Sequence, residues 1–293
     1  MFSETGRLLR AAFEGWWNDR AMSLGASIAF FTVFSLAPML LAAIAVAGLA
    51  FGREAAQGAI VSELGSLIGT DEASALETMI ASASNVGSGI IGTTIGITTF
   101  LLLVTGAVVE LQDSLNIVWK AEPPEGSGLL NFLRTRIISL ALVLGIGFLL
   151  LVSLIIDAGL SAVGAYIEPN FSGATAILRF LNSLVAFAIA VLLFAMIFKV
   201  LPNVDINWGD VWTGSLVTGL LFTIGKFLIG YYLGKSNVAS SYGAAASIIT
   251  ILLWIYYSAL ILLFGAEFTK AYAESRGSRS GVSEKAREAE AGR

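Results

Sequence analysis

Long runs without a charged residue dominate the pattern of hydrophobic and polar positions in this 293-residue chain. About 20 apolar residues, rising roughly 1.5 Å each, carry an α-helix across the hydrocarbon core of a bilayer. The runs lack the two-residue alternation of barrel strands, so we expect helices to satisfy their backbone groups. The gaps between charges predict six transmembrane helices, near residues 27–51, 89–109, 137–156, 180–201, 211–233 and 244–266.

Two further regions have the pattern of amphipathic helices. In the N-terminal segment Leu9, Phe13 and Trp16 recur at i, i+4 and i+7 among charged residues, which predicts a helix lying in the membrane interface. The loop at residues 52–88 is too long for a plain connector, and its apolar stripes predict two short amphipathic helices. These helices either cap the outer face or simply pack on the bundle. The fold class is therefore all-α, a polytopic membrane protein.

Lysine and arginine are distributed unequally between alternate loops, and cytoplasmic loops carry the excess in membrane proteins. With the N-terminus inside, the outer segments hold only three basic residues, Arg53, Arg179 and Lys235. Both termini are therefore predicted to be cytoplasmic. We expect residues 1–273 to form one transmembrane domain, and residues 274–293, with almost nothing to bury, to form a disordered cytoplasmic tail. The first run begins too late for a cleaved signal peptide, so we expect it to persist as a span.

Composition removes several classes of chemistry. The chain has no cysteine and no histidine, which excludes disulfides, thiolate nucleophiles, His-based triads and most zinc sites. Only 13% of the residues are charged and the net charge is −4, so no basic stripe for nucleic acid is present. We therefore predict no enzymatic reaction and no catalytic residue, cofactor or metal. The expected partners are membrane lipids and a small anionic or lipid substrate.

Lys226 is the main candidate for a functional residue, because an ionisable group at membrane depth is costly and is seldom retained without a use. It lies about 15 residues, or roughly 22 Å of helix, into the fifth predicted span, in its outer half. Two structural interpretations stay open beside a functional one. The side chain can extend toward the outer headgroups, or it can pair with Asp157 near the outer end of the third span.

Other candidates lie at helix ends or in broken helices. Glu110, Asp113 and Glu267 end the second and sixth spans on the cytoplasmic side, where a polar cluster with Asn116 and Lys199 is one interpretation and ordinary interfacial placement the other. Pro38 interrupts the first span and predicts a kink there. Five threonines of the second span either line a path or bond to their own helix: Thr93, Thr94, Thr98, Thr99 and Thr105.

Four sequence stretches resemble the YihY/BrkB family of bacterial inner-membrane proteins, one group of which was once labelled ribonuclease BN. They are Ala29–Pro38, Leu115–Trp119, the region from Leu201-Pro202-Asn203 to Lys226, and the region from Tyr242-Gly243-Ala244 to Glu267. The resemblance covers about residues 7–272. It implies a six-helix fold in the bacterial cytoplasmic membrane and places Pro38, Asn116, Lys226 and Glu267 within the family's motifs. A metal-dependent nuclease needs ligands that a histidine-free chain lacks, so ribonuclease activity is disfavoured.

Two functions remain as predictions. The first is a transporter or lipid-handling permease of unknown substrate, favoured by Pro38, the threonines of the second span and Lys226. The second is an envelope scaffold that organises partners and transports nothing. A path that reaches Lys226 would favour the permease, whereas a closed bundle with Lys226 at the headgroups would favour the scaffold.

Overall fold

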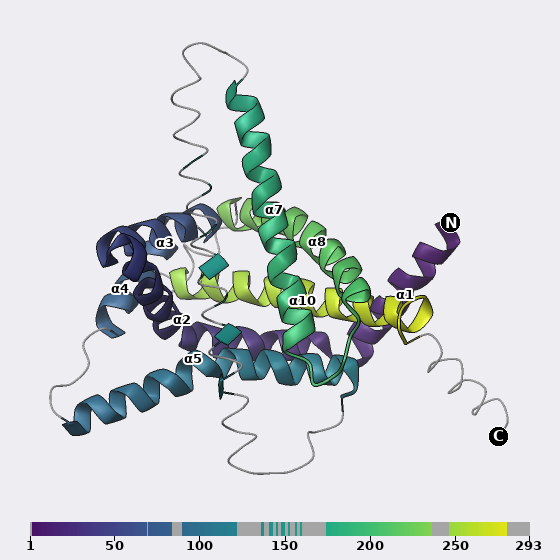
Figure 1. Cartoon of the computed structure of the whole chain (residues 1–293), viewed down its shortest axis with the longest axis horizontal. Coiled ribbons are helices and arrows are strands. Elements are labelled where there is room, and N and C mark those ends of the chain that lie inside the picture. The colour runs from purple at the N-terminus through teal and green to yellow at the C-terminus, as the bar shows by residue number, and fades with distance from the viewer. Residues whose placement is uncertain are drawn as a thin grey trace.

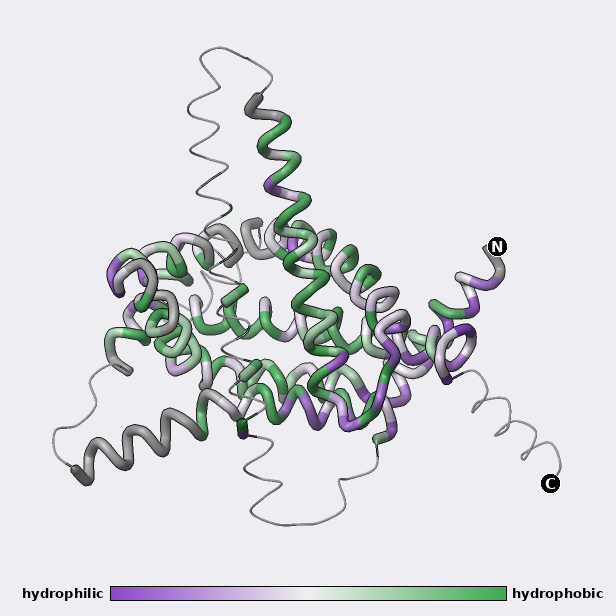
Figure 2. The backbone as a smooth tube through the Cα atoms, viewed as in Figure 1, coloured by the Kyte–Doolittle hydropathy of each residue, from purple (hydrophilic) through white to green (hydrophobic). Residues whose placement is uncertain are grey.

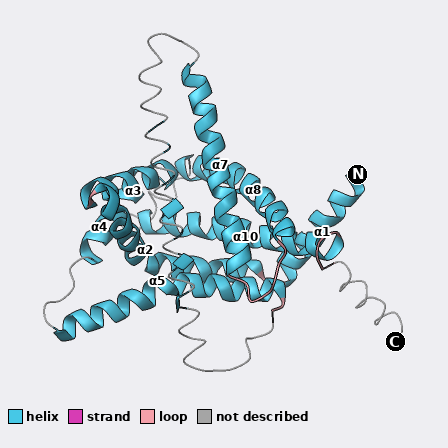
Figure 3. Cartoon of the chain, in the orientation of Figure 1, coloured by secondary structure: helices cyan, strands magenta, loops and turns pink. Residues whose placement is uncertain are grey.

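The computed structural model describes residues 2–68, 70–83, 90–121, 174–235 and 246–279, together with isolated positions between Arg136 and Gly159. Within these residues all regular secondary structure is helical (Figure 3), which confirms the predicted all-α class. The helices are α1 (Phe2–Asn18), α2 (Ala21–Phe51), α3 (Arg53–Ile68), α4 (Thr70–Ala83), α5 (Ile90–Trp119), α7 (Ala174–Val200), α8 (Trp208–Lys235) and α10 (Ala246–Ser275).

Four of these helices are long and apolar enough to cross a membrane. The qualifying segments are Ala21–Ala45, Phe180–Val200, Trp208–Tyr232 and Ala246–Ser275. They coincide with the first, fourth, fifth and sixth predicted spans. The second predicted span, 89–109, falls on α5, whereas most of the third, 137–156, lies outside the described residues, as does Asp157.

The helix α10 is central to the arrangement. It packs against α8, α2, α5 and α1, while α2 also packs against α5 and α7 packs against α8. The helices α2, α5, α8 and α10 follow the long axis of the molecule (Figure 1). Two ends can therefore be distinguished: the α1 end, where α1 and the last turns of α10 lie, and the α3–α4 end opposite it.

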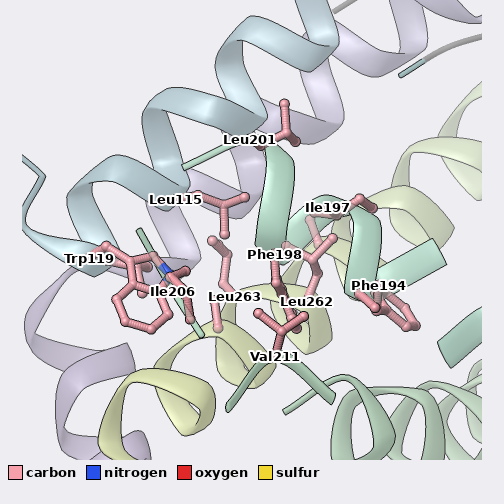
Figure 4. Close-up of a cluster of buried hydrophobic side chains, with 14 of the residues drawn as sticks. Leu115, Trp119, Phe194, Ile197, Phe198, Leu201, Ile206, Val211, Leu262 and Leu263 are labelled. Atoms are coloured by element: carbon pink, nitrogen blue, oxygen red, sulfur yellow. The ribbon is translucent and has the colours of Figure 1, made fainter. Parts of the chain in front are cut away.

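The larger hydrophobic core lies near the α1 end. It joins Leu115 and Trp119 of α5, Phe198 of α7 and Leu263 of α10, together with Leu201 of the loop after α7 (Figure 4). The buried side chains of α7 belong to its C-terminal half, and that half lies on the bundle while the first turns of α7 extend away from it (Figure 1). This core therefore sets the position of the loop between α7 and α8.

A second core holds the α3–α4 end together. Leu76 and Ile80 of α4 pack with Leu40 and Ile44 of α2 and Ile251 of α10. The loop at residues 52–88 thus contains the two predicted short helices, α3 and α4, and their apolar stripes face the bundle. Of the two interpretations left open for these helices, packing on the bundle describes these contacts.

Glycines allow α8 and α10 to approach closely. A Cβ atom on Gly214 of α8 would overlap Thr269 of α10, and a Cβ atom on Gly265 of α10 would overlap Thr218 of α8. Each threonine hydroxyl donates a 2.7 Å hydrogen bond within its own helix, to Gly214 O and Gly265 O respectively. The contact is therefore reciprocal, and small residues at such spacing are what close helix pairs in membranes use.

Hydrophilic positions gather at the two ends of the molecule, on α1 and the loop before α8 at one end and on α3 and α4 at the other (Figure 2). The helix α1 differs in one respect from its predicted face. Leu9, Phe13 and Trp17 are exposed, whereas Trp16 is partly buried and its Nε1 donates to Leu260 O of α10 at 3.2 Å. Trp16 leaves the exposed face because α1 lies across α10 and Trp16 packs against that helix.

Candidate functional site

Asn116 and its neighbours hold the loop that joins α7 to α8. The backbone N–H of Asn203 donates to Asn116 Oδ1 at 2.8 Å, and Gln112 Nε2 donates to Leu201 O at 2.9 Å. Lys199 Nζ donates to Ile206 O at 2.7 Å within the same connection. Backbone groups of an irregular segment need such partners when they leave water. Asn116 therefore acts here as a structural anchor for the loop.

The predicted polar cluster is distributed over separate contacts. Asn116 meets the loop before α8, and Lys199 contacts Ile206 O and lies 5.9 Å from the ring of Trp208. Glu110 and Asp113 lie one turn apart on α5, beyond the predicted second span. Burial, followed by the negative charge of Glu110, raises the pKa of Asp113 above its ordinary value.

Glu267 belongs to a different group. Lys270 Nζ lies 3.5 Å from Glu267 Oε2 and 3.8 Å from Asp19 Oδ2, and all three side chains are largely buried. Asp19 and Lys270 were not among the residues predicted for this site. The spacing of Glu267 and Lys270, three residues apart on one helix, was the available signal, whereas the approach of Asp19 depends on how α1 crosses α10.

A further polar contact at the α1 end involves the residues after α10. The buried carboxylate of Asp210 accepts hydrogen bonds from Ser278 N at 3.0 Å and Ser278 Oγ at 2.7 Å. The guanidinium of Arg279 lies 5.8 Å from the ring centroid of Trp119. The predicted boundary between residues 273 and 274 thus falls inside α10, and residues 276–279 contact α8 and α5. The rest of the predicted tail, residues 280–293, lies outside the described residues.

Pro38 is buried on α2, which is continuous from Ala21 to Phe51. One turn earlier, the hydroxyl of Ser35 bonds to Phe31 O of its own helix and to Leu103 O of α5. Of the five threonines predicted to line a path, Thr105 is buried and accepts a hydrogen bond from Arg136. The side chains of the other four lie outside those described. The polar groups near Pro38 therefore connect α2 to α5.

Lys226 lies apart from all of these groups. It is partly buried on α8, and its Nζ lies 5.7 Å from the ring centroid of Phe227. Among the residues that the structure describes, no carboxylate lies within 4.0 Å of it. Several large apolar side chains are exposed on the same part of α8: Ile224, Phe227, Leu228, Tyr231 and Tyr232. The ammonium is thus surrounded by apolar surface rather than by counter-charges.

No set of three His, Cys, Asp or Glu residues with the geometry to hold a metal ion occurs in the described part of the chain.

Comparison with known proteins places these residues in a family. The model of the family described as virulence factor BrkB matches residues 12–290. A UPF0761 membrane protein of Rhodospirillum centenum is 28% identical over 276 residues, covering 92% of this chain and 58% of that protein. A UPF0761 membrane protein of Verminephrobacter eiseniae is 29% identical, with 92% and 62% of the two chains covered. No solved structure matches.

The chain thus spans about three fifths of the length of these two curated relatives. The matched region nevertheless includes Pro38, Asn116, Lys226 and Glu267, together with all of the described helices except most of α1. The protein is a membrane protein that belongs to the BrkB virulence factor family.

Proposed function

We propose that this chain is a permease of the bacterial cytoplasmic membrane that handles an anionic lipid or a small organic anion, with Lys226 as the anion contact. In this proposal six helices cross the membrane and both termini are cytoplasmic, as the distribution of Lys and Arg favours. The chain has no phosphate-cradling Gly-rich loop ending in Lys-Ser/Thr, so the movement is passive or driven by an ion gradient.

The observation that carries the proposal is the isolation of Lys226. An intramembrane lysine normally pairs with an acid or lines a polar path, because an unpaired charge in hydrocarbon is unfavourable. No described carboxylate neutralises this ammonium, and the adjacent apolar and aromatic side chains favour a ligand with an acyl chain beside its negative charge. A phospholipid headgroup has this combination, with phosphate oxygens for the ammonium and chains for the apolar surface.

Purified protein in liposomes provides the test. Labelled phospholipids are followed between leaflets with the wild type, Lys226→Met, Lys226→Arg and empty vesicles. We expect movement with the wild type, its loss in Lys226→Met and partial recovery in Lys226→Arg, because the arginine retains the charge. Lys120→Met is the matched control, since Lys120 is exposed after α5. Movement that persists in folded Lys226→Met would remove this lysine from the path.

The scaffold is the second candidate, and the α3–α4 end favours it. The apolar sides of α3 and α4 face the bundle, while Arg53, Glu54, Ser62, Ser74 and Glu77 are exposed. A rigidly packed pair of helices with a polar outer face suits the binding of a partner. Well-inserted protein that moves neither lipids nor organic anions, with or without an ion gradient, would favour this candidate over the permease.

A further inference from the structure

The contact between α1 and α10 buries three charged side chains that have no part in the proposed permease path. The side chains of Asp19, Glu267 and Lys270 are 17%, 3% and 12% exposed. The two distances from Lys270 Nζ to the carboxylates, 3.8 Å and 3.5 Å, exceed the 2.7–2.9 Å or so of a charge-assisted hydrogen bond. Lys270 therefore lies between both acids without bonding closely to either.

The group has two acids and one base, and two of its oxygen atoms are unsatisfied. Asp19 Oδ2 and Glu267 Oε1 are buried and accept no hydrogen bond from any described residue. The carboxyl groups of Asp19 and Glu267 are nevertheless within hydrogen-bonding reach of each other. Two carboxyl groups can form a hydrogen bond only when one of them carries a proton. A proton would supply the missing donor and remove the excess negative charge.

Other charged groups leave this balance unchanged. The helix α2, which packs beside α1, contains no charged residue. On α1, Arg10 is paired with Glu14 at 2.7 Å, and Glu4 is paired with Arg276 beyond the end of α10. The acids of α5, Glu110 and Asp113, and Asp210 of α8, which is bonded to Ser278, are not among the groups that act on Glu267. Arg20 follows Asp19 but is exposed.

The helix α1 closes directly over this carboxyl group. A Cβ atom on Gly15 would lie 2.8 Å from Glu267 Cδ, so only glycine allows α1 to approach this closely. The residue between them in space and Asp19 is Trp16, whose Nε1 is bonded to Leu260 O at 3.2 Å. Because these contacts exclude water from Glu267, a net negative charge there would be poorly solvated and would oppose the docking of α1.

We propose that Asp19, Glu267 and Lys270 form a proton-binding site, and that the proton shared between the two carboxyl groups holds α1 against α10. The direction of the pH effect follows from the balance of charge. When the proton leaves to solvent, the site gains one negative charge and α1 is released, so docking weakens as the pH rises. A single linked proton limits the change in the docking equilibrium to about tenfold per pH unit. This inference does not depend on transport.

The absence of native cysteine allows a direct test in reconstituted protein. Ala12→Cys introduces a thiol at a fully buried position of α1, and Gly6→Cys introduces one where a side chain meets open space. The ratio of their rates of alkylation by a soluble maleimide, measured between about pH 6 and pH 9, cancels the ionisation of the thiol. We expect this ratio to rise with pH in the wild-type background. A ratio that is independent of pH would overturn the proposal.

Variants identify the group that takes the proton. Glu267→Gln keeps the shape of a neutral carboxyl group, so its alkylation ratio should stay low at every pH. Glu14→Gln, the matched change of an exposed acid on α1, should keep the wild-type pH dependence. Retention of that dependence in Glu267→Gln would contradict the assignment.

Hydrogen exchange of residues 2–18, corrected for intrinsic rates, supplies the same information without a substitution in α1. Exchange that accelerates with pH in the wild type and not in Glu267→Gln would support the proton site. If added Na⁺ or K⁺ changes docking at constant pH and ionic strength, the ligand is a metal cation and the proton assignment is wrong.

Discussion

The two halves of α8 have opposite surroundings although both belong to one apolar helix. In the first half, Asp210, Gly214 and Thr218 are buried against α10 and the residues after it, and the polar groups of Asp210 and Thr218 have hydrogen-bond partners. In the second half, Ile224 and Phe227 are exposed and Lys226 has no carboxylate partner among the described residues. The first half therefore stabilises the fold, and the second is where a ligand would find an unpaired charge.

The largest expected effect on stability comes from the close approach of α8 and α10. Gly214→Ala should destabilise the protein by about 1–3 kcal/mol, because the added Cβ overlaps Thr269 in a filled interface. Gly230→Ala is the matched change in the second half, where a Cβ would meet nothing within 4 Å. It should be neutral or stabilise by up to about 1 kcal/mol through helix propensity. Denaturation in detergent measures both, and equal losses in the two variants would remove the contrast between the halves.

The next effect concerns the contact between the start of α8 and the residues after α10. Asp210→Ala should cost about 1–3 kcal/mol, since Ser278 N and Ser278 Oγ lose their acceptor. It should also release residues 276–279, which limited proteolysis detects. Asp205→Ala, an exposed acid in the preceding loop, is the control. Unchanged protection of residues 276–279 in Asp210→Ala would show that Ser278 does not hold this segment.

A smaller loss is expected at the loop that leads into α8. Asn116→Ala removes the oxygen that accepts from Asn203 N, and should destabilise the protein by about 1 kcal/mol. Asn116→Asp keeps an acceptor at the same position and should lose less. The free energies of unfolding of the two variants in detergent distinguish these cases. A larger loss in Asn116→Asp than in Asn116→Ala would argue against the accepting role.

Lys226→Met should have the smallest effect on stability, within about 0.5 kcal/mol, because Lys226 contacts no described acid and its neighbours on α8 face outward. Its lipid movement in liposomes should nevertheless be lost if the proposed function holds. This separation of stability from activity sharpens the comparison between the halves. A loss of stability as large as that of Gly214→Ala would instead give Lys226 a structural role.

The candidate residues show how far the sequence reached into the site. Glu267 was identified because an acid ending an apolar run is visible in the sequence, and the structure finds it buried. Its partners were predicted wrongly in kind: acids and amides of α5 were expected, whereas Lys270 and Asp19 lie beside it. Asp210 was missed, since nothing near it in the sequence indicates that Ser278, 68 residues later, would supply two donors.

The sequence by itself determined the helical class, the positions of the long apolar helices and the two short helices between the first pair. These features depend on local hydrophobic periodicity and on the length needed to cross a bilayer, which are properties of consecutive residues. Only the tertiary structure decided that Trp16 faces α10 while Trp17 is exposed, that Gly214 and Gly265 each meet a threonine, and that Asp19 reaches Glu267. Those contacts depend on the angles at which helices cross, and no single segment encodes them.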